Sequence, residues 1–252
     1  MIRQTLGRTK EATYSILVPS PDPAAAGMPT ANGTGFFVDG SGYFVTARHV
    51  IEGFAVEEMW LTQSHTAGGF SPMVQWPELV REWPEFDLAL LKVDFKRNAE
   101  KPHLVGRADF PHVEVDLSPQ EEGLSVYAFG FPLPISQPPT PMAEGAGWVG
   151  HVGLGPRTTS AIISSTLEHT KMIQTAADAQ VYVLDKALNY GNSGGPIIAD
   201  DTGKAFAVCS RFQPVAIPQP GGGAVFVPSL YGVVTALSNI SADLVGLLTY
   251  LS

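Results

Sequence analysis

The stretch Asn189-Tyr190-Gly191-Asn192-Ser193-Gly194-Gly195-Pro196 places one serine among glycines, between two apolar runs. A serine hydroxyl is a weak nucleophile at neutral pH, so it needs a general base beside it and hydrogen-bond donors for the oxyanion formed on attack. Glycines suit such a site, because Gly191 and Gly194 can adopt positive φ and turn backbone N–H groups towards one point. The same string also fits a glycine-rich hairpin turn. The rest of the chain decides between the two interpretations.

A histidine and an aspartate stand at the ends of two earlier apolar runs. His49 comes shortly after residues 35–46, in which two aromatic and β-branched runs flank a glycine-rich turn, a pattern that predicts a β-hairpin. Asp87 opens the apolar run that ends at Val93. A buried carboxylate without a partner costs several kcal/mol, so Asp87 should have one. A histidine N–H is a suitable partner.

Three stretches carry a resemblance to a known family. They are Gly33-Thr-Gly-Phe-Phe-Val-Asp-Gly-Ser-Gly-Tyr-Phe-Val-Thr46 before His49, Phe86-Asp-Leu-Ala-Leu-Leu-Lys-Val93, and Ala187-Leu-Asn-Tyr-Gly-Asn-Ser-Gly-Gly-Pro-Ile197. In this order and spacing the chain resembles the trypsin-like, chymotrypsin-fold serine proteases, and within them the HtrA/Deg-type bacterial branch. The later segment Val225-Phe-Val-Pro-Ser229 resembles the substrate-pocket strand of that branch. The likeness spans roughly residues 33 to 235.

The resemblance implies an all-β fold of two antiparallel six-stranded β-barrels, with the catalytic residues in the cleft between them. Composition agrees, because 26 glycines and 21 prolines with 44% hydrophobic residues favour many short strands joined by turns. Residues 98–120 have the composition of a linker. We therefore expect an N-terminal barrel over residues 1–115 and a C-terminal barrel over residues 116–252. Ser241 is predicted to cap a C-terminal amphipathic helix that carries leucines at helical spacing.

The resemblance also implies the roles of the polar residues. Ser193 would attack a carbonyl, His49 would take its proton, and Asp87 would hold the imidazole in the required tautomer. The backbone N–H groups of Gly191 and Ser193 would form the oxyanion hole. The predicted function is a serine endopeptidase that works through an acyl-enzyme. The alternatives are a protease-fold module that binds a partner peptide without turnover and, more remotely, an esterase, although the alternating helices of the esterase fold are absent from the sequence pattern.

Substrate preference follows from the same resemblance. In this fold the base of the primary specificity pocket lies six residues before the nucleophile, which places the uncharged Ala187 there and predicts a preference for small or aliphatic residues before the scissile bond. The predicted substrate-binding residues are Ala187, Leu188, Cys209, Ser210, Arg211, Val225, Phe226 and Val227.

Two departures from the family pattern affect the predicted mechanism. Asn192 replaces the aspartate that pairs with a newly cut N-terminus in secreted digestive relatives, so we expect activity without N-terminal trimming. Arg48 stands where a small residue is usual, and it could narrow the cleft or bind a carboxylate. In this sequence no peptide-binding (PDZ) segment follows the protease unit, and we expect that branch's trimer-forming and regulatory segments to be absent.

Charge and composition exclude several other functions. A net charge of −9 argues against binding nucleic acid or an anionic membrane, which both require clustered lysine and arginine. No histidines stand at metal-ligand spacing with carboxylates or with Cys209, so neither a metal nor another cofactor is expected. The predicted partners are a protein or peptide substrate and a regulatory protein. One cysteine and an N-terminus without an apolar core predict a cytoplasmic location.

Overall fold

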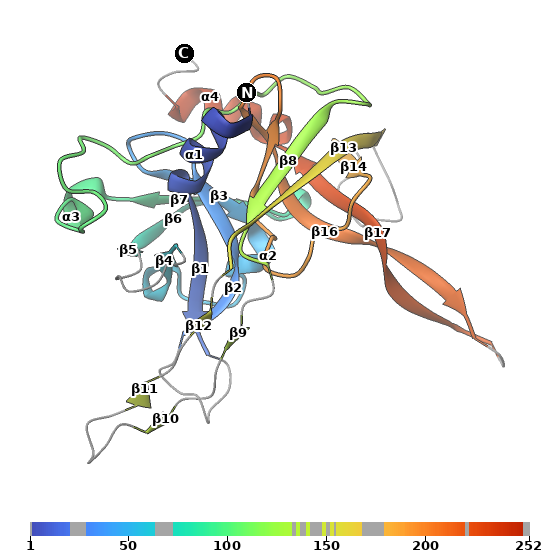
Figure 1. The fold of residues 1–252 in the computed structure, drawn as a ribbon, viewed down its shortest axis with the longest axis horizontal. Coiled ribbons are helices and arrows are strands. Elements are labelled where there is room, and N and C mark those ends of the chain that lie inside the picture. Colours follow the sequence, from blue (N-terminus) through green and yellow to red (C-terminus); the bar gives the residue numbers. More distant parts are fainter. Residues whose placement is uncertain are drawn as a thin grey trace.

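A computed structural model describes residues 2–20, 29–63, 73–132, 135–136, 140–141, 148–149, 152–153, 155–167, 179–219 and 222–248. The first half of the chain forms a strongly curved antiparallel sheet and the second half a closed β-barrel, with short helices at the periphery (Figure 1). The predicted all-β class with a C-terminal helix is therefore confirmed.

The sheet of the first half has seven strands in the order β5-β4-β1-β2-β3-β7-β6. Their bounds are β1 Thr13–Pro19, β2 Pro29–Phe37, β3 Tyr43–Ala47, β4 Trp60–Thr62, β5 Met73–Gln75, β6 Pro77–Trp83 and β7 Leu88–Val93. The expected six-stranded barrel differs in detail, because β5 and β6 lie at opposite ends of this sheet and do not pair with each other in the described residues. Trp76, which lies between β5 and β6, has a positive φ of 59°, and the chain turns there. After this turn β6 pairs with β7.

The predicted hairpin is formed by β2 and β3. Gly35 pairs with Thr46 and Phe37 with Phe44, and the turn between the strands is held by the Asp39 carboxylate. One oxygen of that carboxylate accepts from the backbone N–H groups of Gly42 and Tyr43 at 3.0 and 2.9 Å. An aspartate that bonds the backbone a few residues ahead is a common way to close such a turn.

The second half closes into a six-stranded barrel in the order β13-β14-β17-β16-β15-β8. The bounds are β8 Ser125–Gly130, β13 Arg157–Leu167, β14 Val181–Leu184, β15 Pro196–Ala199, β16 Ala205–Pro218 and β17 Ala224–Ala236. Two further pairs are formed by β9 (Ile135–Ser136) with β12 (Val152–Gly153) and by β10 (Thr140–Pro141) with β11 (Trp148–Val149). The far ends of β16 and β17 project from the barrel as a two-stranded ribbon (Figure 1).

The helical elements are short. They are α1 Ile2–Ala12, α2 Arg48–Ile51, η2 Val56–Glu58, η3 Pro84–Phe86, α3 Phe95–Asn98, η5 Leu237–Ile240 and α4 Ser241–Leu247. None of the helices in the described ranges combines the length and apolar content needed to cross a membrane.

The C-terminal helix α4 packs on the first half of the chain. Leu244 and Leu248 are buried in the same apolar cluster as Phe37, Leu90 and other side chains of the first sheet. The Trp83 Nε1–H of β6 donates to the Asp243 carboxylate at 2.9 Å. The predicted capping role of Ser241 is wrong, because Ile240 occupies the N-cap position and makes no side-chain capping bond. The preceding turn η5 continues directly into the helix, which leaves Ser241 inside the helical run.

Side chains from both halves share one core. The first apolar cluster also includes Ile198, Ala205 and Val208 of the barrel, and a bridge joins Val115 to Ala205. The division of the chain near residue 115 stays a prediction. Because the two halves share this core, their packing fixes the position of one half relative to the other.

Candidate active site

Strand register places His49 beside Asp87. Ala47, the last residue of β3, pairs with Leu88, the first residue of β7, so the residues just beyond these strand ends are neighbours. The backbone N–H of Arg48 donates to the Asp87 carbonyl at 3.0 Å, which ties the start of α2 to this corner. Asp87 itself has φ 55°, a left-handed conformation that a short polar residue tolerates. The corner therefore aims both side chains out of the sheet edge.

The Asp87 carboxylate accepts hydrogen bonds from three donors. The His49 backbone N–H reaches Oδ1 at 3.0 Å, His49 Nδ1 lies 2.8 Å from Oδ2, and the Ser210 hydroxyl donates to Oδ2 at 2.8 Å. Burial alone would raise the pKa of Asp87, but the hydrogen bonds from His49 and Ser210 and the charge of His49 outweigh it and lower that pKa. The group is therefore a carboxylate at neutral pH. Because a carboxylate can only accept, His49 Nδ1 must carry the proton in the contact with Asp87 Oδ2. In the neutral imidazole, Nε2 is then the acceptor.

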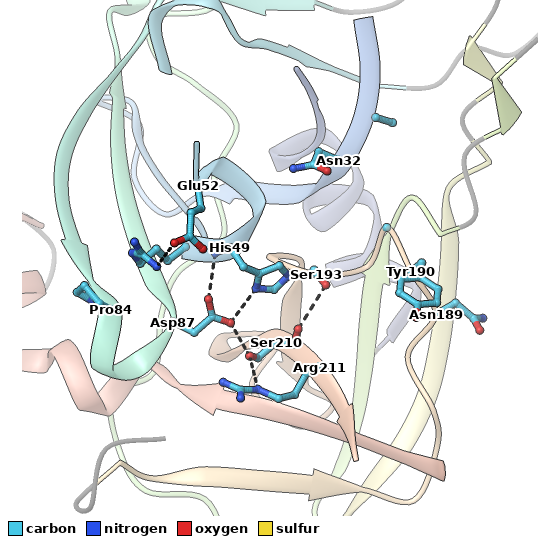
Figure 2. A pocket seen from close by; sticks show the side chains of 13 residues that line it. Asn32, His49, Glu52, Pro84, Asp87, Asn189, Tyr190, Ser193, Ser210 and Arg211 are labelled. Carbon is cyan, nitrogen blue, oxygen red and sulfur yellow. Dashed lines mark hydrogen bonds and ion pairs between the residues drawn. The ribbon is translucent and has the colours of Figure 1, made fainter. Parts of the chain in front are cut away.

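Ser193 lies in the loop between β14 and β15. The Gly194 N–H donates to the Cys209 carbonyl at 2.7 Å and the Cys209 N–H to the Gly195 carbonyl at 2.8 Å, which fixes the loop against β16. The Ser193 hydroxyl donates to the Ser210 carbonyl at 3.3 Å. Figure 2 shows the His49 imidazole between the Asp87 carboxylate and the Ser193 side chain. The structure thus places His49, Asp87 and Ser193 at one cleft, and their predicted catalytic roles stay a prediction.

The loop before Ser193 presents backbone donors. Gly191 and Gly194 have φ of 92° and 85°, and a Cβ on Gly191 would overlap the Phe131 carbonyl. The Asn192 N–H donates back to the Asn189 carbonyl at 3.1 Å, which closes a tight turn. The N–H groups of Gly191 and Ser193 have no acceptor among the described residues. An oxyanion hole requires backbone donors that are free to bind a substrate oxygen, and these two N–H groups meet that condition.

A cleft of about 800 Å³ surrounds these groups. Besides His49, Asp87, Gly191, Ser193, Ser210 and Arg211, it is lined by Ala31, Asn32, Arg48, Glu52, Pro84, Asn189 and Tyr190. Sequence reasoning did not assign Asn32, Asn189 or Tyr190 to the site, although each stands next to a glycine motif already recognised. Within the described ranges, no three His, Cys, Asp or Glu side chains are grouped to hold a metal ion.

Several predicted substrate-binding residues do not line this cleft. Leu188 and Cys209 are buried in the barrel core, where burial raises the pKa of the Cys209 thiol. Ala187 is half-buried, and Val225 is exposed on the projecting ribbon, paired with Ile217. Phe226 and Val227 continue that strand, and their side chains lie outside the described ones. The assignment of these six residues to a specificity pocket stays a prediction.

Arg48 forms ion pairs within its own chain. Its Nη1 lies 3.0 Å from Glu52 Oε1, and its Nε lies 3.7 Å from Glu82 Oε2. The Arg48 side chain is 27% exposed and forms part of the cleft wall next to His49. Arg48 thus lines the cleft, and the carboxylates that it pairs with, those of Glu52 and Glu82, belong to this protein.

The fold and the site together define the class of protein: a chymotrypsin-like β protein with a serine, an imidazole and a carboxylate in the cleft between its two halves. A family model of the trypsin-like peptidase domain matches residues 33–208. This chain therefore belongs to the trypsin-like peptidase domain family.

Curated relatives support the predicted HtrA/Deg branch. The chain is 30% identical over 209 residues to a probable periplasmic serine endoprotease, DegP-like, of Bartonella henselae, covering 82% of this chain and 32% of that protein. It is 26% identical over 212 residues to the chloroplastic Protease Do-like 1 of Arabidopsis thaliana, covering 83% of this chain and 40% of that protein. The chain thus spans between about a third and two fifths of the length of these relatives.

Solved structures share the fold. The HtrA-type protease AlgW with a decapeptide superimposes with a TM-score of 0.59 at 18% identity, over 98% of this chain and 66% of that one. A serine endoprotease from Yersinia pestis gives a TM-score of 0.56 at 18% identity, over 98% of this chain and 65% of that one. At this level of identity the likeness establishes the fold alone.

The predicted cytoplasmic location is contradicted by these relatives, which are named as a periplasmic and a chloroplastic protease. The inference from cysteine was wrong for a physical reason. A disulfide needs two cysteines, so a chain with one cannot report the redox state of its compartment. Cys209 is 3% exposed in the barrel core, where a thiol acts as a small apolar side chain in any compartment.

Proposed function

We propose that this chain is a serine endopeptidase that cleaves peptide bonds through an acyl-enzyme on Ser193. The observation that carries the proposal is the 2.8 Å contact between His49 Nδ1 and the Asp87 carboxylate, in the cleft that Ser193 also lines. The His49 backbone N–H and the Ser210 hydroxyl donate to the same carboxylate. That contact leaves Nε2 of His49 as a base that faces the serine. The bound tripeptide and decapeptide named for the AlgW structures support a peptide as the substrate class.

The proposed reaction has two stages. Ser193 Oγ attacks the scissile carbonyl while His49 Nε2 takes the hydroxyl proton, and the N–H groups of Gly191 and Ser193 bind the resulting oxyanion. His49 then gives the proton to the leaving amine, and a water molecule hydrolyses the acyl-enzyme with His49 again as the base. The Ser193 hydroxyl must first exchange its 3.3 Å bond to the Ser210 carbonyl for one to His49 Nε2. This exchange requires the Ser193 side chain to rotate, and catalytic hydrogen bonds often tighten only when substrate is bound.

A fluorophosphonate probe tests the proposed function. Ser193 Oγ would bond to phosphorus as fluoride leaves, and the serine proton would pass to His49. Mass spectrometry of the digested protein should locate the adduct on Ser193, while heat-denatured chain should stay unlabelled. An unfolded protein incubated with the chain should be cut at defined bonds. A chain that neither labels nor cleaves, although folded, would instead support the binding-module alternative.

We further propose a preference for small or aliphatic residues before the scissile bond. The family resemblance places the uncharged Ala187 at the base of the pocket, and the nearby Asp185 carboxylate already accepts from the Ile162 N–H at 2.9 Å. Peptides that differ only in the residue before the scissile bond, as Val, Phe or Arg, should rank with Val highest in kcat/KM, by about tenfold over Arg. Steady-state kinetics with the three peptides measures this, and a dominant Arg preference would contradict it.

Replacing Asp87 with asparagine should lower kcat by a factor on the order of 10⁴. The asparagine amide would present its NH₂ to His49 Nδ1 or leave that contact unmade, so the imidazole would carry its proton on Nε2 and could not accept from Ser193. Because the folded pKa of Asp87 is lowered, its carboxylate stabilises the fold above about pH 4, the unfolded value, and this contribution is lost as the pH falls through the folded pKa. The plot of Tm against pH should therefore fall less steeply on the acid side for Asp87→Asn than for wild type.

Asp94→Asn is the matched control. Asp94 caps α3 by accepting from the Lys96 N–H at 2.8 Å, and asparagine caps a helix equally well. Its kcat should stay within about threefold of wild type. If Asp87→Asn also stayed within that range, the assigned role of Asp87 would be wrong.

A further inference from the structure

Thr34 lies where the two halves of the protein meet, beneath the loop that carries Ser193. It belongs to β2 of the first sheet and is completely buried. Its backbone N–H donates to the Ser193 carbonyl at 2.8 Å, and its own carbonyl accepts from the Thr46 hydroxyl at 2.7 Å. The main chain of Thr34 therefore links the first sheet to the nucleophile of the second half.

The Thr34 hydroxyl makes two further bonds of opposite sense. It donates to the Gly191 carbonyl at 2.5 Å and accepts from the Phe131 N–H at 3.2 Å. A carbonyl needs a donor and an N–H needs an acceptor, and a hydroxyl can serve both at once. Valine has nearly the same shape as threonine but can serve neither. The loop therefore needs the hydroxyl of Thr34, and a side chain of the same volume without a hydroxyl would leave both backbone groups unpaired.

These contacts hold the carbonyl groups of two residues that line the cleft, Gly191 and Ser193. Gly191 and Ser193 each direct their carbonyl to Thr34, and their N–H groups have no acceptor among the described residues. Phe131, the second partner of the hydroxyl, also packs against Gly191, where a Cβ would overlap its carbonyl. Backbone donors stabilise an oxyanion most when their direction is fixed before the reaction.

We propose that the Thr34 hydroxyl positions the oxyanion loop, which we define as residues 190–193. By holding the Gly191 carbonyl and the Phe131 N–H together, it keeps the N–H groups of Gly191 and Ser193 aimed at the site where negative charge develops. Thr34 is a positioning residue, since it reaches the reaction only through this loop. The inference rests on the proposed peptidase function.

The test compares Thr34→Val with Thr34→Ser in the full chain. The substrate is a peptide that wild type cleaves, identified by the cleavage experiment above. Thr34→Val should lower kcat roughly 10- to 100-fold with KM within about threefold of wild type, because ground-state binding does not use the oxyanion donors. Thr34→Ser keeps the hydroxyl and should stay within about threefold of wild type in kcat. The rate of Ser193 labelling by the fluorophosphonate should fall with kcat, because the phosphoryl oxygen occupies the same donors.

Thr13→Val is the matched control for loss of a buried hydroxyl. The Thr13 hydroxyl is equally buried and donates to the Thr9 carbonyl at 2.7 Å, away from the cleft lining. This variant should lose thermal stability and keep its kcat. If Thr34→Val does not fold, Thr34→Cys replaces it with the same criteria, since a thiol is a weak donor and acceptor of similar size.

Three results would overturn the inference. They are a kcat within about threefold of wild type for the valine or cysteine variant, a loss that lies in KM alone, or a serine variant as impaired as the valine variant. A wild-type chain that neither labels nor cleaves would overturn the proposed function and this inference with it. Active wild type with an unimpaired Thr34→Val would overturn this inference alone.

Discussion

Replacing Ser193 with alanine is expected to lower kcat by a factor on the order of 10⁶ and to abolish fluorophosphonate labelling. Without the hydroxyl no acyl-enzyme can form, and the residual rate comes from substrate binding and the oxyanion donors alone. The fold should persist, because within the described part of the chain the Ser193 hydroxyl makes one hydrogen bond, at 3.3 Å to the Ser210 carbonyl, and losing it costs about 1 kcal/mol or less. Steady-state kinetics and a thermal melt measure the two effects separately.

Ser164→Ala provides the control for this variant. The Ser164 hydroxyl also donates to a main-chain carbonyl, that of Val183 at 3.0 Å, but it belongs to β13 and does not line the cleft. Its kcat should match wild type within about threefold. Retention of more than about 1% of wild-type kcat by Ser193→Ala would show that another group is the nucleophile.

Replacing His49 with alanine is expected to lower kcat by a similar factor, on the order of 10⁶. The His49 imidazole lies between Asp87 and Ser193, and without this base the serine keeps its proton. Because the two residues act as one unit, the double variant Ser193→Ala/His49→Ala should be about as slow as either single variant. Kinetics of the three proteins under identical conditions tests this non-additivity.

His112→Ala is the corresponding histidine control. His112 lies outside the cleft lining, with Nδ1 3.1 Å from the Phe110 carbonyl. It should keep kcat within about threefold of wild type. If the double variant instead lost kcat by the product of the two single-variant factors, Ser193 and His49 would act independently. That result would contradict the proposed mechanism.

Local signals were sufficient for the strands and turns near the site. The hairpin of β2 and β3 could be predicted because its alternation, its glycines and the Asp39 turn all act within a dozen residues. The same holds for Gly191 and Gly194 beside Ser193, whose positive φ values are allowed by the lack of a Cβ.

Helix α1 was not predicted, since its own sequence carries a weak signal. Gly7 interrupts it, and most of its residues are polar, with Ile2, Leu6 and Ala12 as the apolar side chains. Two of its described contacts are with residues far along the chain: the Thr9 hydroxyl lies 3.1 Å from the Tyr127 hydroxyl, and Arg107 pairs with Glu11 at 2.8 Å. A short helix of this kind forms because distant residues bind it, which no local pattern can report.

The amino-acid sequence by itself determined the all-β class and the family resemblance, because composition and short motifs with a specific residue order carry both. The same motifs singled out His49, Asp87 and Ser193 as the candidate catalytic residues. Only the tertiary structure decided that Ser210 binds Asp87, that Thr34 bridges Gly191 and Phe131, and that α4 packs on the opposite half of the chain. These contacts join residues from different halves of the chain. Nothing in the local sequence around a hydroxyl or a leucine indicates which distant group it will contact. Their geometry is set by how the two halves pack, which depends on all the buried side chains at once.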